Sequence, residues 1–431
     1  MNDEFRHEEN DMPRPRTMAE KLLSRAANRP LVAGEVAVCK PDYAMGTDGS
    51  IPMALDYLGE MLEGHERGPF APDRVVFALD HYDSTSGAGA LLLQARARDY
   101  AQAHAITLFD VGDGIGHQLM MERGHAAPGR LLVGADSHAT SYGAFNCFGT
   151  GIGSSDLAGI LFCGALWLEV PSSIRIVLDG QFAPGVGAKD VALYLARTLD
   201  AGGATYKALE FTGPGLANLD MDDRIVLANM SVELGAKAGL FPHDAVLAQH
   251  LDEIGVDGVT AVTADPDAPY VHTLTVDIGR LRPQIALPHR VDNVIDLADA
   301  PRTRVDVVYL GTCTGGRLRD YAEALEILTA AGRIARDVQV IVTPASRSIR
   351  EAMERTGMIE QFRGLGAQLE SPGCGACCGT CGPIPAANQK IISSANRNFR
   401  GRMGNADAEI YLASPVSCAR AAVEGAFGQE A

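Results

Sequence analysis

The sequence is poor in cysteine and in aromatic residues. Phe, Trp and Tyr make up 6% of the 431 residues, with a single tryptophan. The nine cysteines are a sparse, odd number, and no secretion signal precedes them, which argues against a disulfide-stapled extracellular protein. This pattern is typical of reduced thiols, so we expect a cytoplasmic location.

Long apolar runs are also missing. The strongest run, 158–168, is too short to cross a membrane and ends in Glu169. The N-terminus is charged and has no apolar signal core. We therefore expect no membrane partner.

Positive charge is scarce, with 37 Lys and Arg against 54 Asp and Glu and a formal net charge of −17. This balance repels phosphate backbones, and the basic residues do not cluster, so we expect no nucleic-acid partner. An acidic chain can still bind an anionic metabolite if a few arginines lie inside a pocket.

Glycine and apolar residues are plentiful. The 47 glycines and the apolar content of 46% predict an α/β protein with tight strand-to-helix turns. The chain is too long for one core, so we expect several domains. A helix should begin after Thr17, which can cap it, and run to about Ala27. The expected organisation is a disordered tail (1–16), an α/β domain with Asp-His loops (17–172), a second α/β domain with a linker (173–300) and an α/β domain with the cysteines (301–431).

Titratable residues follow three predicted strands. A strand at 74–79 precedes Asp80-His81, a strand at 106–111 precedes a glycine-rich turn and His117, and a strand at 131–133 precedes Asp136-Ser137-His138. One histidine alone is more often structural. Three such loops within sixty residues favour a site, because parallel sheets form clefts past their strand ends.

Two further stretches carry polar residues. A helix predicted from Met221 to about Ala238 places Asn229 and Glu233 on one face, although a solvated helix face is the alternative. The segment 396–402 contains Arg397 and Arg402. Arginine matches carboxylate geometry, but a charged surface is the plainer interpretation.

The cysteines suggest a metal centre. Cys374 and Cys377 form a C-x-x-C pair beside glycines, and Cys313 follows the apolar run 305–310, which predicts a buried strand of a parallel sheet. Three thiols in this pattern favour an iron-sulfur cluster. A zinc site that includes Cys378 and Cys381, or ordinary thiols, stay open as alternatives.

Taken together, these motifs resemble the aconitase family over nearly the whole chain. The motifs are Asp80-His81, Gly134-Ala135-Asp136-Ser137-His138, Asn229 to Glu233, Gly311-Thr312-Cys313-Thr314, Cys374 to Cys377, and Asn396-Arg397-Asn398-Phe399 with Gly401-Arg402. The resemblance implies a three-domain α/β fold with a central cluster cleft. It also implies a [4Fe-4S] cluster held by Cys313, Cys374 and Cys377, with one iron left open for substrate.

The resemblance further implies a hydro-lyase that acts on a small hydroxy acid. Asp80 and His81 would protonate the leaving hydroxyl, and the pairs His117–Asp136 and His138–Glu233 would support the chemistry. The expected substrate or cluster contacts are Ser137, Asn229, Asn396, Arg397 and Arg402. The first expected substrate is 3-isopropylmalate, with homoaconitate, citramalate or 2,3-dimethylmalate as alternatives. A cluster-free RNA-binding regulator is the alternative of another class.

The chain also differs from the family pattern. It reaches its last motif without the swivelling domain that supplies the catalytic base and another arginine in full-length aconitases, so the resemblance implies a separate small subunit. Gly315 stands where relatives usually have asparagine, and Cys378 and Cys381 are additional. These changes alter the surroundings of the expected cluster and leave room for a specialised paralogue.

Overall fold

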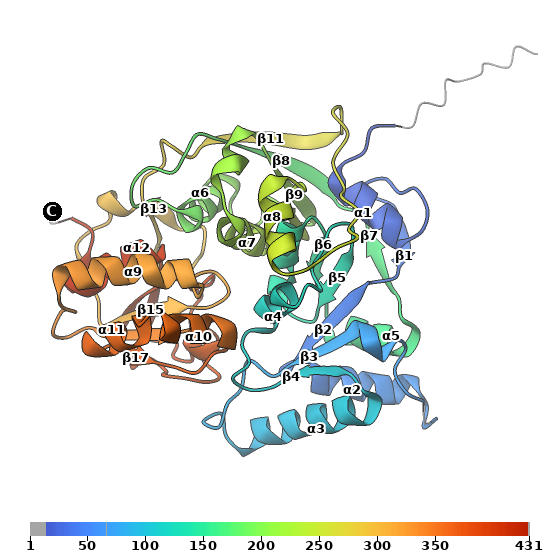
Figure 1. Cartoon of the computed structure of the whole chain (residues 1–431), viewed down its shortest axis with the longest axis horizontal. Coiled ribbons are helices and arrows are strands. Elements are labelled where there is room, and N and C mark those ends of the chain that lie inside the picture. Colours follow the sequence, from blue (N-terminus) through green and yellow to red (C-terminus); the bar gives the residue numbers. More distant parts are fainter. Residues whose placement is uncertain (1–13, 66, 430–431) are drawn as a thin grey trace, which may run out of the picture.

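The structure is a computed structural model that describes residues 14–65 and 67–429. Helices and strands alternate along the chain and form three main sheets (Figure 1). This confirms the α/β class with sheets flanked by helices. Residues 1–13 of the predicted tail lie outside the described residues. Arg16, near its end, donates its backbone N–H to Asp265 Oδ2 at 2.8 Å.

The first helix begins where Thr17 predicts. In α1 (Met18–Ala26), the Thr17 hydroxyl accepts a hydrogen bond from the backbone N–H of Glu20, and the Glu20 carboxylate accepts one from the backbone N–H of Thr17. This reciprocal capping box satisfies two free N–H groups of the first turn. The predicted helix is confirmed at both ends, since Ala27 is its C-cap. A small antiparallel pair follows, made by β1 (Val36–Cys39) and β7 (Leu166–Glu169).

The first main sheet has five parallel strands. In spatial order they are β4 (Thr107–Phe109), β3 (Val75–Ala78), β2 (Tyr43–Thr47), β5 (Leu131–Gly134) and β6 (Phe148–Gly151). Its helices are α2 (Ile51–Met61), α3 (Ala88–His104), α4 (Gly116–Glu122) and α5 (Ser154–Cys163). α2 packs against α5 and α3 (Figure 1). Because β3 and β5 are buried along their whole length, polar side chains of these segments lie past the strand ends.

The second main sheet has four parallel strands and is covered by three helices. In spatial order the strands are β10 (Ala238–Leu240), β9 (Lys207–Thr212), β8 (Ser172–Asp179) and β11 (Tyr270–Asp277). The helices are α6 (Ala188–Leu199), α7 (Met221–Met230) and α8 (Ala245–Glu253). α7 packs against the 3-10 helix Ser137–Phe145, which follows β5, and so joins the second sheet to the first.

The helix predicted from Met221 to about Ala238 is too long. α7 ends at Met230, and a 3-10 turn, Ser231–Leu234, follows it. The Ser231 hydroxyl donates to the carbonyl of Leu227, a contact that competes with helical geometry, and Gly235 then takes a φ of 85°. Glu233 therefore reaches the site from the turn and not from the face of a continuing helix.

The third main sheet has seven strands. In spatial order they are β13 (Val294–Asp296), β12 (Gln284–Ala286), β19 (Glu409–Leu412), β18 (Lys390–Ser393), β15 (Val307–Gly311), β16 (Gln339–Thr343) and β17 (Gln368–Leu369). Its helices are α9 (Leu318–Ala331), α10 (Arg347–Arg355), α11 (Met358–Gly364) and α12 (Pro415–Glu424), and a short pair joins β14 (Thr303–Arg304) to β20 (Ala426–Phe427). β15 is buried throughout and parallel to both neighbours, which confirms the strand predicted before Cys313.

The three sheets follow one another along the chain, although one stretch is shared. Residues 265–301 contribute β11 to the second sheet and β12 and β13 to the third. The domain bounds at 172/173 and 300/301 stay predictions.

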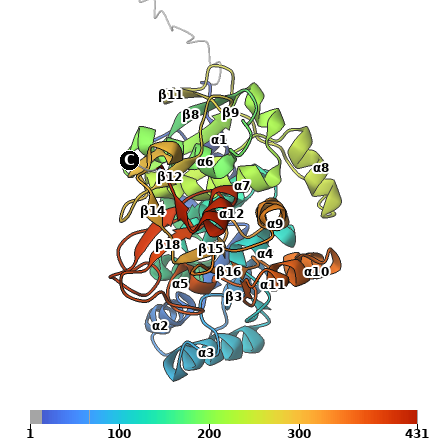
Figure 2. The same ribbon diagram turned by 90° about the vertical axis from the view of Figure 1, so that its left-hand side faces the viewer.

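Loops of the first and third sheets meet at one place. Gly114 and Ser346 form an isolated antiparallel bridge, and the backbone N–H of Cys374 donates to the carbonyl of Asp80 at 3.0 Å. Figure 2 looks from the side of the third sheet, with β15 and β16 near the middle of the molecule. The Asp-His loop and the cysteine loop therefore lie side by side, joined by the backbone hydrogen bond between Cys374 and Asp80.

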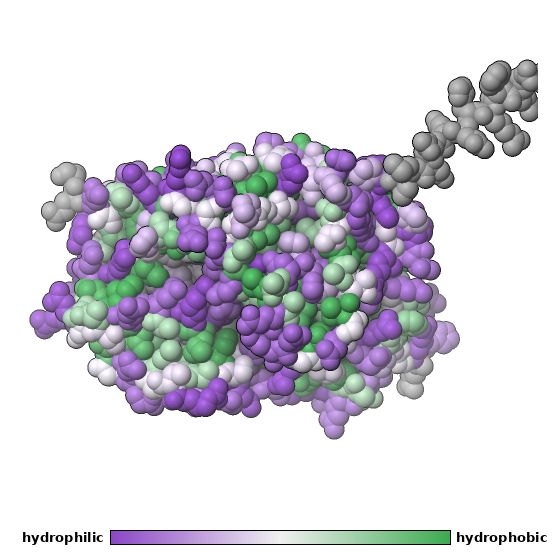
Figure 3. Space-filling model, turned by 45° about the horizontal axis from the view of Figure 1, so that its top comes forward, coloured by the Kyte–Doolittle hydropathy of each residue, from purple (hydrophilic) through white to green (hydrophobic). Residues whose placement is uncertain are grey.

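The surface is mixed in character. Hydrophilic residues cover most of the face in Figure 3, and smaller hydrophobic patches lie between them. Within residues 14–65 and 67–429, no helix has the length and apolar content needed to cross a membrane.

Candidate active site

The loop after β3 carries an oriented histidine. Asp80 Oδ1 lies 2.7 Å from His81 Nδ1, and Asp80 Oδ2 accepts the backbone N–H of Gly116 at 2.8 Å. The buried carboxylate of Asp48 accepts the backbone N–H of His81 at 3.1 Å, a contact that the sequence did not indicate. Burial alone would lower the pKa of His81, but Asp80 and then Asp136 raise it well above its usual value. His81 is therefore suited to hold a proton near neutral pH.

A second histidine pairs with Asp136, which follows β5. His117 Nε2 lies 2.7 Å from Asp136 Oδ1, and His117 Nδ1 lies 2.9 Å from the Tyr142 hydroxyl. Burial would raise the pKa of Asp136, but hydrogen bonds from His117 and His138 hold it well below its usual value. Asp136 is therefore an ionised carboxylate that orients the His117 imidazole and accepts the backbone N–H of His138 at 2.9 Å.

A third histidine connects the first two sheets. His138 Nε2 lies 2.9 Å from Glu233 Oε1, and Arg397 Nε donates to the two oxygens of Glu233 at 2.8 and 3.0 Å. Burial lowers the pKa of His138, but its hydrogen bonds to Asp136 and Glu233 outweigh this and raise it. Ser137, which begins the 3-10 helix, lies between Asp136 and His138 in the same loop. Both predicted histidine–carboxylate pairs are present, while the catalytic roles of these residues stay predictions.

Cys313 follows β15 and is buried. Its sulfur receives the amide N–H of Asn229 at 3.1 Å and that of Asn396 at 3.2 Å. Burial raises the pKa of the Cys313 thiol to about 11, so a bound metal would be needed to keep it deprotonated at neutral pH. The two amides come from different parts of the fold. Asn229 lies on α7, a helix of the second sheet, and Asn396 lies in the loop after β18 of the third sheet.

The C-x-x-C loop turns sharply beside the same amides. Gly375 has a φ of +59°, and a Cβ there would lie 2.6 Å from the Tyr309 hydroxyl, so the turn requires glycine. The Cys377 thiol points toward Asn396 Oδ1 at 3.7 Å, and Arg402 Nη2 donates to the Cys377 sulfur at 3.4 Å. A hydrogen bond from Cys374 and the charge of Arg402 lower the pKa of Cys377 well below its usual value, although burial opposes them.

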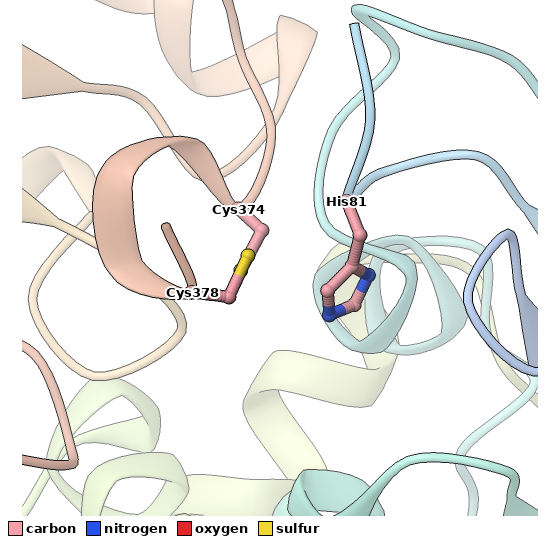
Figure 4. A group of neighbouring side chains, drawn as sticks. All are labelled: His81, Cys374 and Cys378. Atoms are coloured by element: carbon pink, nitrogen blue, oxygen red, sulfur yellow. The ribbon is translucent and has the colours of Figure 1, made fainter. Parts of the chain in front are cut away.

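Among the described residues, one group with metal-binding geometry differs from the predicted ligand set. Ligand atoms of His81, Cys374 and Cys378 all lie within 4.8 Å of one another, and Figure 4 shows the imidazole facing the two cysteines. Cys313 and Cys377 are not part of this close group; Asn396 bridges them instead. The structure thus brings Cys378 to the site, although the cluster predicted from the family resemblance does not include it.

A cavity of about 260 Å³ lies between the two loops that meet here. Asp80 and Tyr82 line one side, and Ser371, Gly373 and Cys381 line the other. The cavity lies next to the Asp-His loop and is slightly smaller than typical small-molecule sites, which have volumes of about 300–1,000 Å³.

Glycine at position 315, where the family pattern usually has asparagine, has a steric reason. A Cβ on Gly315 would collide with the side chain of Ser394, which exchanges two hydrogen bonds with the backbone of Gly311, each at 3.1 Å. Any larger residue at 315 would displace Ser394 and disturb the loop that carries Cys313.

Lys189 supports the site and was missed by sequence reasoning. This buried residue of α6 donates to the carbonyls of Ser394 at 3.0 Å and Ala395 at 2.6 Å, and to the Thr314 hydroxyl at 3.2 Å. Burial lowers its pKa to about 8. A lysine in the first turn of a helix opposes the helix dipole, and this was the only signal in the sequence.

The comparison with protein families agrees with this geometry. Residues 92–425 match the model described as the aconitase family (aconitate hydratase). The chain belongs to the aconitase family. The predicted family and the predicted enzyme class, a hydro-lyase, are thereby confirmed.

Curated relatives match this aconitase-family chain over most of its length. The 3-isopropylmalate dehydratase large subunit 1 of Thermotoga maritima is 40% identical over 414 residues, which cover 95% of this chain and 97% of the relative. The homoaconitase large subunit of Thermus thermophilus is 41% identical over 414 residues, with coverage of 95% and 96%. Among solved structures, the holo-form of Thermococcus kodakaraensis aconitase X has 12% sequence identity and a TM-score of 0.49, and covers 84% of each chain.

Proposed function

We propose that this chain is the large subunit of a [4Fe-4S] hydro-lyase that dehydrates and rehydrates a small hydroxy acid, with 3-isopropylmalate as the substrate. The observation that carries the proposal is the pair of amide N–H groups that converge on Cys313 Sγ. Donors of this kind suit a sulfur that carries negative charge as a cluster ligand.

The donor set fits such a cluster. Cys313, Cys374 and Cys377 are buried thiols on two loops at the same end of the third sheet, and Gly375 leaves room beside the C-x-x-C turn. Asn229, Asn396 and Arg402 provide the surrounding N–H donors. When bound, the cluster would supply an open iron that acts as a Lewis acid toward a substrate carboxylate and the departing hydroxyl.

The chain's own residues would supply protons and charge. His81, held protonated by Asp80, would give its proton to the hydroxyl that leaves, because hydroxide is a poor leaving group. Asp136 and Glu233 would fix the orientation of His117 and His138. The terminal nitrogens of Arg397, whose Nε is held by Glu233, would bind a substrate carboxylate with Arg402.

A separate small subunit would complete the site. The curated relatives cited above are named large subunits, and they align with this chain over nearly their whole length. We propose that a small partner supplies the base that removes the proton from carbon. A partner seated over the site would also exclude water during the reaction.

Homoaconitate is the second candidate substrate, because the Thermus relative has the same degree of identity. The test is turnover of 3-isopropylmalate, homoaconitate, citramalate and 2,3-dimethylmalate by the anaerobically reconstituted chain together with a small subunit from the same source. The proposal predicts the highest kcat/KM for 3-isopropylmalate. If only another acid is turned over, that acid replaces 3-isopropylmalate as the proposed substrate. If none of the four acids is turned over, the proposed function is contradicted.

A further inference from the structure

His81, Cys374 and Cys378 form a compact group of soft ligands. Their ligand atoms lie within 4.8 Å of one another, and Figure 4 shows the two cysteine sulfurs directed toward each other, with the imidazole opposite them on the other loop. Zn–S and Zn–N distances place the ligand atoms of a tetrahedral zinc site about 3.5–3.8 Å apart. No pair of ligand atoms would therefore have to close by more than about 1 Å to reach this spacing.

The imidazole is already oriented for metal binding. His81 Nδ1 lies at hydrogen-bond distance, 2.7 Å, from Asp80 Oδ1, and Asp80 Oδ2 accepts the backbone N–H of Gly116. The nearest acidic oxygen to Nε2 is that of Asp136, which lies 3.7 Å away, beyond hydrogen-bond distance. A carboxylate behind one histidine nitrogen is the usual support for a metal bound at the other.

The thiol of Cys378 is held beside His81 and remains reachable. Its sulfur lies 2.7 Å from the Thr380 hydroxyl, and that hydroxyl donates to the carbonyl of His81 at 2.6 Å. Cys374 is buried, whereas Cys378 and His81 are only partly buried. An ion can therefore approach from the side of Cys378 without opening the core.

We propose that the cluster-free chain binds one soft divalent cation, such as Zn²⁺, through His81, Cys374 and Cys378. Two thiolates and one imidazole suit zinc and leave a fourth position for water. On binding, each thiol loses its proton, and His81, which Asp80 otherwise holds protonated, releases the proton on Nε2 to solvent. The site goes beyond the proposed function, but it shares Cys374 with the proposed cluster, so zinc and cluster would exclude each other.

Cobalt titration of the full cluster-free chain tests the site, because Co²⁺ reports thiolate ligation by its absorbance. We expect one Co²⁺ per chain with sulfur-to-cobalt charge-transfer bands, displaced by one Zn²⁺. Cys378→Ser should weaken binding by more than about 100-fold, since loss of a supporting group alone costs about 10–100-fold. Cys377→Ser and Cys381→Ser are matched controls from the same loop and should bind normally.

Three outcomes would overturn the site: no cobalt binding by the wild-type chain, full binding by Cys378→Ser, or an equal loss in Cys377→Ser. Circular dichroism shows whether each variant is folded. His81→Ala is the second variant, and it should keep the thiolate bands at lower affinity if the imidazole is a ligand. Unchanged affinity in His81→Ala would remove His81 from the site.

The competition between zinc and the cluster can be measured separately, by the iron and sulfide content of the reconstituted chain. Zinc loaded before reconstitution should lower the iron and sulfide content of the wild-type chain and spare that of Cys378→Ser. If zinc binds but cluster assembly is unaffected, Cys374 is not shared and the proposed cluster ligands are wrong, while the zinc site stands. Failure of the zinc site and failure of the proposed function are thus distinguishable.

Discussion

Asn396 and Cys313 are joined by a hydrogen bond of 3.2 Å from Nδ2 to Sγ. The same Asn396 amide also donates to Asn229 Oδ1 at 3.1 Å, and its oxygen faces the Cys377 thiol. One buried side chain thus links the cysteine after β15, the C-x-x-C loop and α7. This link places two of the proposed cluster ligands relative to each other before any metal is bound.

Asn396→Ala should weaken cluster binding. The variant loses a buried N–H donor to sulfur, and a hydrogen bond to a charged group contributes about 1.5–3 kcal/mol, which corresponds to about tenfold or more in affinity. Iron and sulfide content after limited reconstitution measures the effect. Asn398→Ala is the control, because this neighbour donates to the carbonyl of Leu287 instead of a sulfur. Equal cluster content in the two variants would contradict the assignment.

Glu233→Gln should leave the cluster in place and lower turnover. The carboxylate orients His138 and holds Arg397, so its loss should lower kcat by about 10²-fold or more. Glu233 also raises the pKa of His138, so in the variant the alkaline limb of the pH–rate profile should move to lower pH if His138 acts protonated. Glu253→Gln, at an exposed position of α8, is the control. A profile and kcat like those of the control would exclude a role for Glu233.

Arg397→Lys and Arg402→Lys should both impair substrate use. Lysine keeps the charge but loses the planar fork that binds a carboxylate at two points, and the loss of about 1.5–3 kcal/mol lowers kcat/KM by about 10–100-fold. Arg400→Lys, in the same segment but exposed, should behave as the wild type. Steady-state kinetics decide the matter, and unchanged kcat/KM in both variants would make these arginines structural.

Asp244→Asn should lower the free energy of unfolding, because Asp244 pairs with Arg224 of α7. Arg224, which is fully buried, donates to both Asp244 oxygens at 2.7 Å. Removing one charge of a buried pair costs about 3–5 kcal/mol, and we expect about 2–4 kcal/mol because Asp244 is partly exposed. Urea unfolding followed by circular dichroism measures the difference. Asp337→Asn, which breaks an exposed pair with Arg304, should cost less than about 1 kcal/mol.

The Asp244 effect should also depend on pH. Burial would raise the pKa of Asp244, but the hydrogen bond from Arg224 lowers it below its usual value. The stabilisation is therefore present above about pH 4 and is lost as the pH falls through the lowered folded-state pKa. The gap between wild type and Asp244→Asn should narrow in acid. A gap that stays constant down to pH 2 would show that the charge of Asp244 is not its source.

Local patterns predicted much of the fold and the site. The capping residue Thr17, the buried strand before Cys313 and the polar residues past the ends of β3 and β5 all depend on short-range rules, and all are present. The predicted length of α7 was wrong. A side-chain hydrogen bond of Ser231 and the turn at Gly235 end the helix earlier than its composition suggests.

Contacts between distant segments could not be predicted in this way. The bonds from Lys189 to Ser394 and Ala395 join positions more than two hundred residues apart, and no local pattern encodes them. The cluster ligands expected from the family motif do not include Cys378, and its position beside His81 depends on how two sheets pack.

Mössbauer spectroscopy of the chain reconstituted anaerobically with ⁵⁷Fe and combined with its small subunit, before and after addition of 3-isopropylmalate, tests the central claim most directly. An open iron in a [4Fe-4S] cluster would be the one iron of four that changes its coordination when substrate binds. We expect about a quarter of the iron signal to shift with substrate, and the cluster signal to be lost in Cys313→Ser, Cys374→Ser and Cys377→Ser. A spectrum that substrate leaves unchanged, or a cluster that survives loss of any of these three thiols, would contradict the account.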